Sequence, residues 1–232
     1  MFDIMQNVLL IFLEIICCKI FYETFEEIRY KGWINIVQFI LFLSSMCLLA
    51  YGFSKYFAIR QIAVILMFSV FMLWHVKISL KKSLILAVLY DALLLAVDYL
   101  LFSIVEWLFL GSELSEQQYE IGGILAYLLG KVILFFLVLL IRKKFGKKSV
   151  EMMVDTEWLR FLFFPVFTIA VISVMLSSFK DVTTVEEANL LAIIAFGMVG
   201  MNIVVFYLIN DIVEREMKMH ENRVFQIQAR NQ

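Results

Sequence analysis

The chain has 232 residues and a formal net charge of −1; 63% of the residues are hydrophobic, 16% are aromatic and one is proline. Its mean hydropathy is +0.91. A water-soluble fold of this length could not bury so much apolar surface, so the composition excludes that class and predicts an all-α polytopic membrane helix bundle. The three cysteines are Cys17, Cys18 and Cys47. They form no C-x-x-C pair and lie in or beside apolar runs, so neither a disulfide framework nor a zinc site is predicted.

Seven apolar segments are long enough, or nearly so, to cross a bilayer core, which takes about 20 helical residues. In chain order they cover roughly residues 4–22, 34–53, 61–76, 84–110, 121–141, 159–178 and 188–209. The third segment is short, so a bundle of six spans is the alternative. The first segment begins almost at Met1, without a basic stretch before it or a small-residue cleavage site after it. It is therefore predicted to be a retained span and not a removable signal peptide.

The basic residues predict an orientation. The connection after the fifth segment reads RKKFGKKS, and an excess of Lys and Arg marks the cytoplasmic side of a membrane protein. The other connections on that side carry Lys19, Arg29, Lys31, Lys77, Lys81 and Lys82. The connections on the opposite side lean acidic and carry Lys55, Arg60 and Lys180. We therefore expect the N-terminus outside the cell and the C-terminus in the cytoplasm.

Four ionisable residues fall inside the predicted spans, where charge is costly and usually serves function. They are Glu14, Asp91, Asp98 and Lys131. At 1.5 Å per residue, Glu14, Asp98 and Lys131 lie about eleven, twelve and ten residues from the outer ends of their spans, near one level. The short connection between spans four and five predicts an Asp98–Lys131 pair, and Asp91 shares a helix face with Asp98. The set is interpreted as an ion pair that fixes helix register, as a polar switch or ligand anchor, or as an ion pathway. Pro165 is expected to kink or locally unwind the sixth span.

Two short stretches are similar to boxes of the CPBP intramembrane proteases, whose patterns are E-E-x-x-x-R and F-x-x-x-H. They are FEEIRYKG, from Phe25 to Gly32, and FMLWH, from Phe71 to His75. Lys31 stands where the arginine should be, and the second histidine, His220, is far away, so the metal-binding set cannot be completed. His75 is instead interpreted as an interfacial residue beside Trp74. No phosphate loop, nucleophile elbow or zinc motif occurs, so no catalytic residue and no metal ligand is predicted.

The last stretch, from Asn210 to Gln232, is polar and contains neither glycine nor proline. A 4,3,4,3 spacing that starts at Phe206 predicts a coiled-coil-like helix continuous with the last span. Its seam consists of Asn210, Val213, Met217, His220, Val224 and Ile227. We expect this cytoplasmic helix to pair two copies of the chain, and a solvated tail without a partner is the alternative. No helix stop signal follows, which predicts a helix that is cut and not finished.

Two stretches of the chain resemble the N-terminal sensor region of GHKL-type (HPK10) histidine kinases, the group that contains the accessory-gene-regulator peptide receptors. These are FYETFEEIRYKGWINIVQFILF after the first span and NDIVEREMKMHENRVFQIQARNQ after the last. The resemblance covers the whole chain, and much of it is architectural. It implies a bacterial plasma-membrane protein with six or seven spans, a parallel homodimer, and sensing of a small ligand such as a peptide. Residues 1–209 would form the transmembrane sensor domain, and residues 210–232 the start of the signalling and dimerisation helix.

The chain departs from this family because it contains no R-H-D-x-K-N-H box and no ATP-binding domain. ATP, Mg²⁺ and the response regulator would therefore belong to a kinase core beyond this chain, and no cofactor is expected here. His220 lacks the K-N-H continuation of a phosphoacceptor and is assigned to the seam. The expected partners are the lipid bilayer, a second copy and a small peptide ligand, with no nucleic acid. The alternative function is a transporter or permease component, although the chain shows no internal repeat.

Overall fold

The computed structural model describes residues 2–53, 57–110, 116–144, 155–178 and 184–230, and these residues are almost entirely helical. The helices are α1 (Phe2–Phe25), α2 (Trp33–Gly52), α3 (Phe57–His75), α4 (Leu80–Leu110), α5 (Glu116–Lys144), α6 (Asp155–Ser178) and α7 (Val185–Arg230). Each covers one of the seven apolar segments of the sequence to within one residue. The all-α prediction is confirmed for the described residues.

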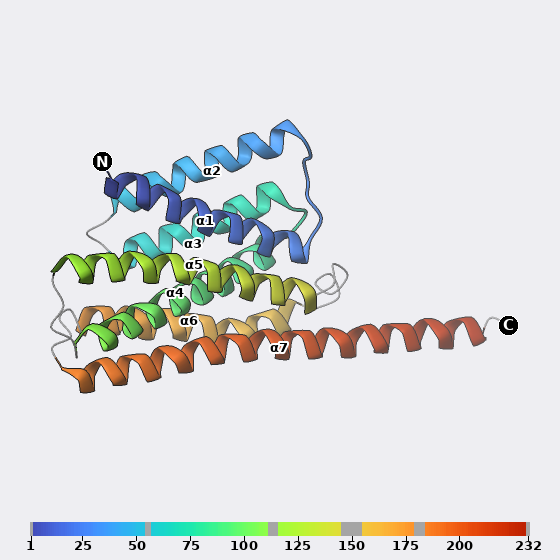
Figure 1. Cartoon of the computed structure of the whole chain (residues 1–232). Coiled ribbons are helices and arrows are strands. Elements are labelled where there is room, and N and C mark those ends of the chain that lie inside the picture. The colour runs from blue at the N-terminus through green and yellow to red at the C-terminus, as the bar shows by residue number, and fades with distance from the viewer. Residues whose placement is uncertain (1, 54–56, 111–115, 145–154, 179–183, 231–232) are drawn as a thin grey trace.

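Successive helices run in opposite directions, so the bundle has two ends (Figure 1). α4 lies in the middle and contacts α1, α3, α5, α6 and α7. In its most apolar stretch 78% of the residues are buried, against 17% in α2 and 22% in α5. Sequence hydropathy alone does not separate these three helices, because a residue that faces lipid and one that faces protein are equally apolar. α4 is thus the core around which the other helices pack.

By length and composition, four helices among the described residues could cross a membrane: α2, the Leu80–Val105 part of α4, the Ile121–Lys144 part of α5, and the Glu186–Ile209 part of α7. α3 and α6 contain shorter apolar segments, Ile59–His75 and Leu162–Met175. Large apolar side chains such as Leu48, Ile193 and Phe196 are more than two-thirds exposed on the outer faces. Such faces are compatible with contact with a lipid bilayer and not with water.

One end of the bundle is basic. It carries Arg29, Lys31, Lys77, Lys81, Lys82, Arg142, Lys143 and Lys144, and we call it the basic end. α7 has 46 residues and leaves the bundle at this end, continuing well past the other helices (Figure 1). The N-terminus of α1 lies at the opposite end (Figure 1).

Two connections pair with each other at the basic end. The backbone N–H of Arg29 donates to the His75 carbonyl over 2.8 Å, and Ile28 forms an antiparallel bridge with Val76. His75 ends α3 and is fully buried, and its ring stacks on Phe71. Its predicted position at the membrane interface stays a prediction. Its Nε2 lies 3.1 Å from Oε1 of Glu23.

Glu23 lies one residue beyond the first predicted span. Burial raises the pKa of this carboxyl, but the hydrogen bond with His75 and the nearby charge of Lys19 outweigh burial and hold the pKa below its usual range. Glu23 is therefore an ionised partner for His75, and the contact ties the end of α1 to the end of α3.

α6 continues through Pro165 as one α-helix, so the expected local unwinding is absent. Pro165 itself is buried in the bundle. One turn later, the Thr168 hydroxyl donates to the carbonyl of Phe164 in its own helix over 3.0 Å.

Candidate functional site

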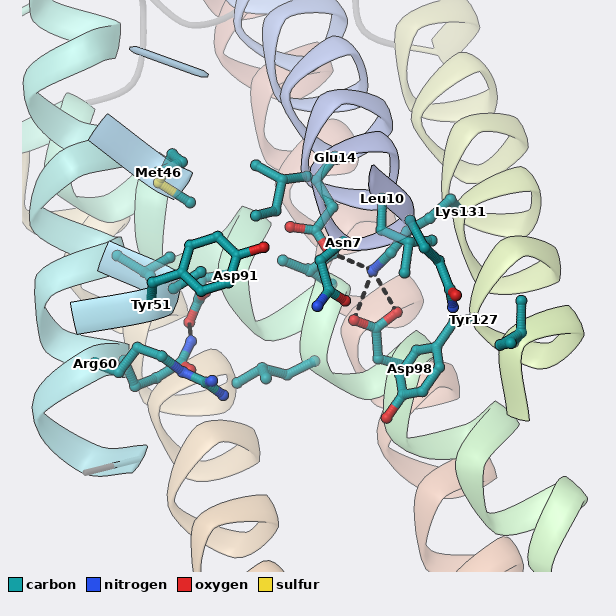
Figure 2. Close-up of a pocket in the computed structure, with 18 of the residues that line it drawn as sticks. Asn7, Leu10, Glu14, Met46, Tyr51, Arg60, Asp91, Asp98, Tyr127 and Lys131 are labelled. Carbon is teal, nitrogen blue, oxygen red and sulfur yellow. Dashed lines mark hydrogen bonds and ion pairs between the residues drawn. The ribbon is translucent and has the colours of Figure 1, made fainter. Parts of the chain in front are cut away.

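A cavity of about 540 Å³ lies between α1, α2, α3, α4 and α5 (Figure 2). Its lining includes Gln6 near the start of α1, Tyr51 at the end of α2 and Arg60 near the start of α3. These three positions lie towards the end of the bundle opposite the basic end. The cavity therefore extends from that end towards the middle of the bundle, where its lining includes Glu14, Asp98 and Lys131.

Three of the four predicted intramembrane residues meet in this cavity (Figure 2). Nζ of Lys131 lies 2.6 Å from Oε1 of Glu14 and 2.7 Å from both carboxylate oxygens of Asp98. The lysine side chain is 2% exposed, and those of Glu14 and Asp98 are 18% and 24% exposed. The Asp98–Lys131 pair predicted from the short α4–α5 connection is present, and Glu14 joins it from α1.

Gly130 permits the close approach of α4 and α5 at this point. A Cβ atom at Gly130 would lie 3.0 Å from Cδ1 of Leu101 and 3.4 Å from Oδ1 of Asp98. A side chain here would therefore push against the carboxylate that holds Lys131. The glycine thus keeps the charged residues of the two helices within hydrogen-bonding distance.

Glu14, Asp98 and Lys131 together are called the charged triad below. Asp91, the fourth predicted residue, lies apart from this triad but on the same face of α4 as Asp98. It is fully buried, forms part of the cavity wall, and its Oδ2 accepts a hydrogen bond from Nε2 of Gln61 on α3. Within the described part of the chain, its Oδ1 accepts no hydrogen bond. An acceptor buried in this way costs about 1 to 3 kcal/mol unless a partner arrives.

Sequence reasoning missed the polar side chains that complete the cavity. Asn7, Gln61 and Tyr127 line it together with Tyr51 and Arg60, and Figure 2 shows Arg60 on the same side as Asp91. Gln61 offered a usable signal, because an amide within an apolar run needs a buried partner. Asn7, Tyr51 and Tyr127 gave no such signal, since amides and tyrosines near span ends are ordinary interfacial residues.

A second polar contact joins α6 to α7. Asn202 and Thr168 are fully buried, and Nδ2 of Asn202 donates to the Thr168 hydroxyl over 3.0 Å and to the Met198 carbonyl over 2.9 Å. Oδ1 of Asn202 has no partner among the described residues. This contact lies one turn from Pro165 and binds the apolar part of α7 to its neighbour.

The predicted seam lies on the part of α7 that continues beyond the bundle. Its backbone is helical throughout, and His220 is exposed. The side chains of the other seam residues, Asn210, Val213, Met217, Val224 and Ile227, fall outside those that the structure describes. The pairing of two copies along this seam stays a prediction.

Comparison with protein-family models, with curated proteins and with solved structures finds no match for this chain. In the described residues, no group of three or more His, Cys, Asp or Glu side chains is arranged to hold a metal ion.

Proposed function

We propose that this chain is the membrane-embedded sensor module of a bacterial two-component histidine kinase. One observation carries the proposal: α7 is a single unbroken helix from Val185 to Arg230. Its first half is apolar enough to cross a membrane, and its second half is polar and extends past the basic end. A rigid helix of this kind can transmit a shift or rotation within the bilayer to a domain outside it.

The position of the cavity supports the same direction of signalling. In the seven-span arrangement, with basic residues in the cytoplasm, the cavity faces the outside and α7 enters the cytoplasm. A small ligand, for which a peptide is one candidate, would enter the cavity from outside. The signal would leave along α7 to a dimer of kinase cores, which would supply the sites for ATP and Mg²⁺ and the contact with a response regulator.

α4 connects the cavity to α7. It carries Asp91 and Asp98 in the cavity wall, and its other faces pack against α6 and α7. A second route runs through α1, because the rings of Phe21 and Phe206 meet edge to face with centroids 6.0 Å apart. Movement of either helix against the cavity would therefore reach the apolar half of α7.

The test is a chimera in which residues 1–230 are joined in heptad register to the core of a dimeric histidine kinase. If α7 transmits the signal, inserting seven residues at the junction preserves autophosphorylation, because the seam keeps its phase. Inserting two or four residues rotates the seam and changes the rate several-fold. Equal rates for all insertions would overturn the proposal.

A transporter or permease component is the second candidate, and the charged triad in an open cavity favours it. Uptake assays on Asp98→Asn and Lys131→Met variants decide between the two. Loss of uptake of a defined solute in both variants would favour transport; absent or unchanged uptake would remove that function.

A further inference from the structure

We propose that the cavity recognises a small organic molecule through a primary ammonium group, and that this group binds at Oδ1 of Asp91. The inference defines the ligand class for the sensor proposed above and rests on that proposal for its biological role. The binding site itself is argued from the charge, the unpaired acceptor and the shape of the cavity.

The cavity lining carries a net negative formal charge. It contains three carboxylates, Glu14, Asp91 and Asp98, and two cationic side chains, Lys131 and Arg60, which gives a formal charge of −1. The ammonium of Lys131 is already shared between Glu14 and Asp98. A buried carboxylate without a cationic partner is costly, and either a bound proton or a positively charged ligand relieves that cost.

The unpaired acceptor identifies where the cation binds. Asp91 is fully buried in the cavity wall, Gln61 occupies Oδ2, and Oδ1 accepts no hydrogen bond from any described residue. An ammonium group supplies both the missing N–H donor and the missing charge. Because Oδ1 has no exposed surface, a wall side chain such as Gln61 must move to admit the ligand. Binding is therefore linked to movement of a side chain in the cavity wall.

The shape and the walls favour an organic ammonium over a bare metal ion. A metal ion such as Na⁺ or Ca²⁺ needs several oxygen ligands around it, and Asp91 offers one unpaired carboxylate oxygen. The rest of the wall is largely apolar and includes Leu10, Val64 and Leu94. A volume of about 540 Å³ accommodates an alkyl or larger organic group attached to the ammonium. Tyr51 and Tyr127 add aromatic rings that attract cations.

The test uses the full chain in lipid nanodiscs and four probes: n-butylammonium, tetramethylammonium, 1-butanol and Na⁺. Saturation-transfer NMR measures binding of the organic probes, and the midpoint of thermal unfolding reports all four. We expect saturable binding of butylammonium only. Tetramethylammonium keeps the charge but lacks N–H donors, and butanol keeps the chain but lacks the charge. Equal binding of any of the other three would overturn the inference.

Variants locate the site. Asp91→Asn should weaken butylammonium binding by about ten-fold or more, because it removes the charged acceptor. Asp211→Asn, which removes a carboxylate from the exposed part of α7, is the matched control and should bind normally. Unchanged binding by a folded Asp91→Asn protein would overturn the inference.

A second variant keeps every charge and fills the cavity. A Cβ at Gly123 meets no heavy atom within 4 Å, so Gly123→Leu should fold and block the site. Leu125→Phe adds bulk to the exposed face of the same helix and serves as its control. Binding that survives Gly123→Leu would place the ligand elsewhere and overturn the inference.

The experiments distinguish failure of this ligand class from failure of the proposed sensor role. If butylammonium binds at Asp91 but leaves the cytoplasmic half of α7 unchanged, the ligand class stands and the sensor role fails. If none of the probes binds while the register insertions still change kinase activity, the sensor role stands and this ligand class fails.

Discussion

Lys131 shows how this chain holds a charge within an apolar bundle. Its side chain is 2% exposed, and two carboxylates from different helices bind its ammonium within 2.7 Å. The residual negative charge of the three groups lies beside the cavity, where Glu14 and Asp98 keep some exposure. Removing only one of the three groups is destabilising, because the remaining charges are partly buried and lose the partner that neutralises them.

Lys131→Met should destabilise the protein by about 3 kcal/mol, because it leaves Glu14 and Asp98 as unpaired carboxylates. Unfolding by sodium dodecyl sulfate from mild detergent micelles measures the change. The triple variant Glu14→Gln, Asp98→Asn and Lys131→Met removes the charges together and should recover most of the loss. Lys131→Met with wild-type stability would show that the triad does not hold the helices together.

Gly130→Ala tests the close approach of α4 and α5. The added Cβ meets Leu101 at 3.0 Å and the Asp98 carboxylate at 3.4 Å, so we expect a loss of about 1 to 2 kcal/mol from overpacking. Gly123→Ala lies two turns earlier on the same helix, where nothing is within 4 Å. It should stabilise α5 by about 0.5 kcal/mol through helix propensity. Equal effects of the two substitutions in the same unfolding assay would contradict this packing.

At the scale of the helices, the sequence predicted the apolar segments well and the packing poorly. Runs of apolar residues mark helices in a membrane-like chain, but they do not reveal that α4 is the core. The short connection between α4 and α5 was enough to predict the Asp98–Lys131 contact. The contact between Asp91 and Gln61, which joins α4 to α3, could not be predicted from the sequence. It depends on how each helix is rotated about its axis, and tertiary packing sets that rotation.

The contact between Asn202 and Thr168 gives a prediction for the pairing of α6 and α7. Thr168→Val keeps the shape but removes the acceptor for Nδ2 of Asn202, so we expect a loss of about 1 kcal/mol. Asn202→Leu should cost less, because it also removes the unpaired Oδ1.

Ser173→Ala is the control in the same unfolding assay, since the Ser173 hydroxyl bonds to its own helix at Ile169. It should change stability by less than about 0.5 kcal/mol. If Asn202→Leu lowers the free energy of unfolding more than Thr168→Val does, the interhelical hydrogen bond is not the main contribution of this contact to stability.

At the scale of the whole molecule, the alternation of helix directions follows from seven apolar segments joined by short connections. The basic residues gather at one end, as the sequence predicted from its loops, and α7 leaves the bundle there (Figure 1). The proposed direction of signalling rests on the same asymmetry: the cavity lies towards one end of the bundle, and α7 extends from the other end. The sequence could not predict the cavity, because its lining comes from five helices whose rotations depend on the packed bundle.

The most direct test of the proposed sensor is disulfide crosslinking at Val224→Cys in membranes. The background carries Cys47→Ala, because Cys17 and Cys18 are buried and Cys47 is partly exposed. We expect a crosslinked dimer whose yield changes at least about two-fold when Gly123→Leu fills the cavity, and not when Leu125→Phe alters the exposed face of α5. A chain that stays monomeric, or a yield that is the same with the cavity open and filled, would contradict transmission from the cavity through α7.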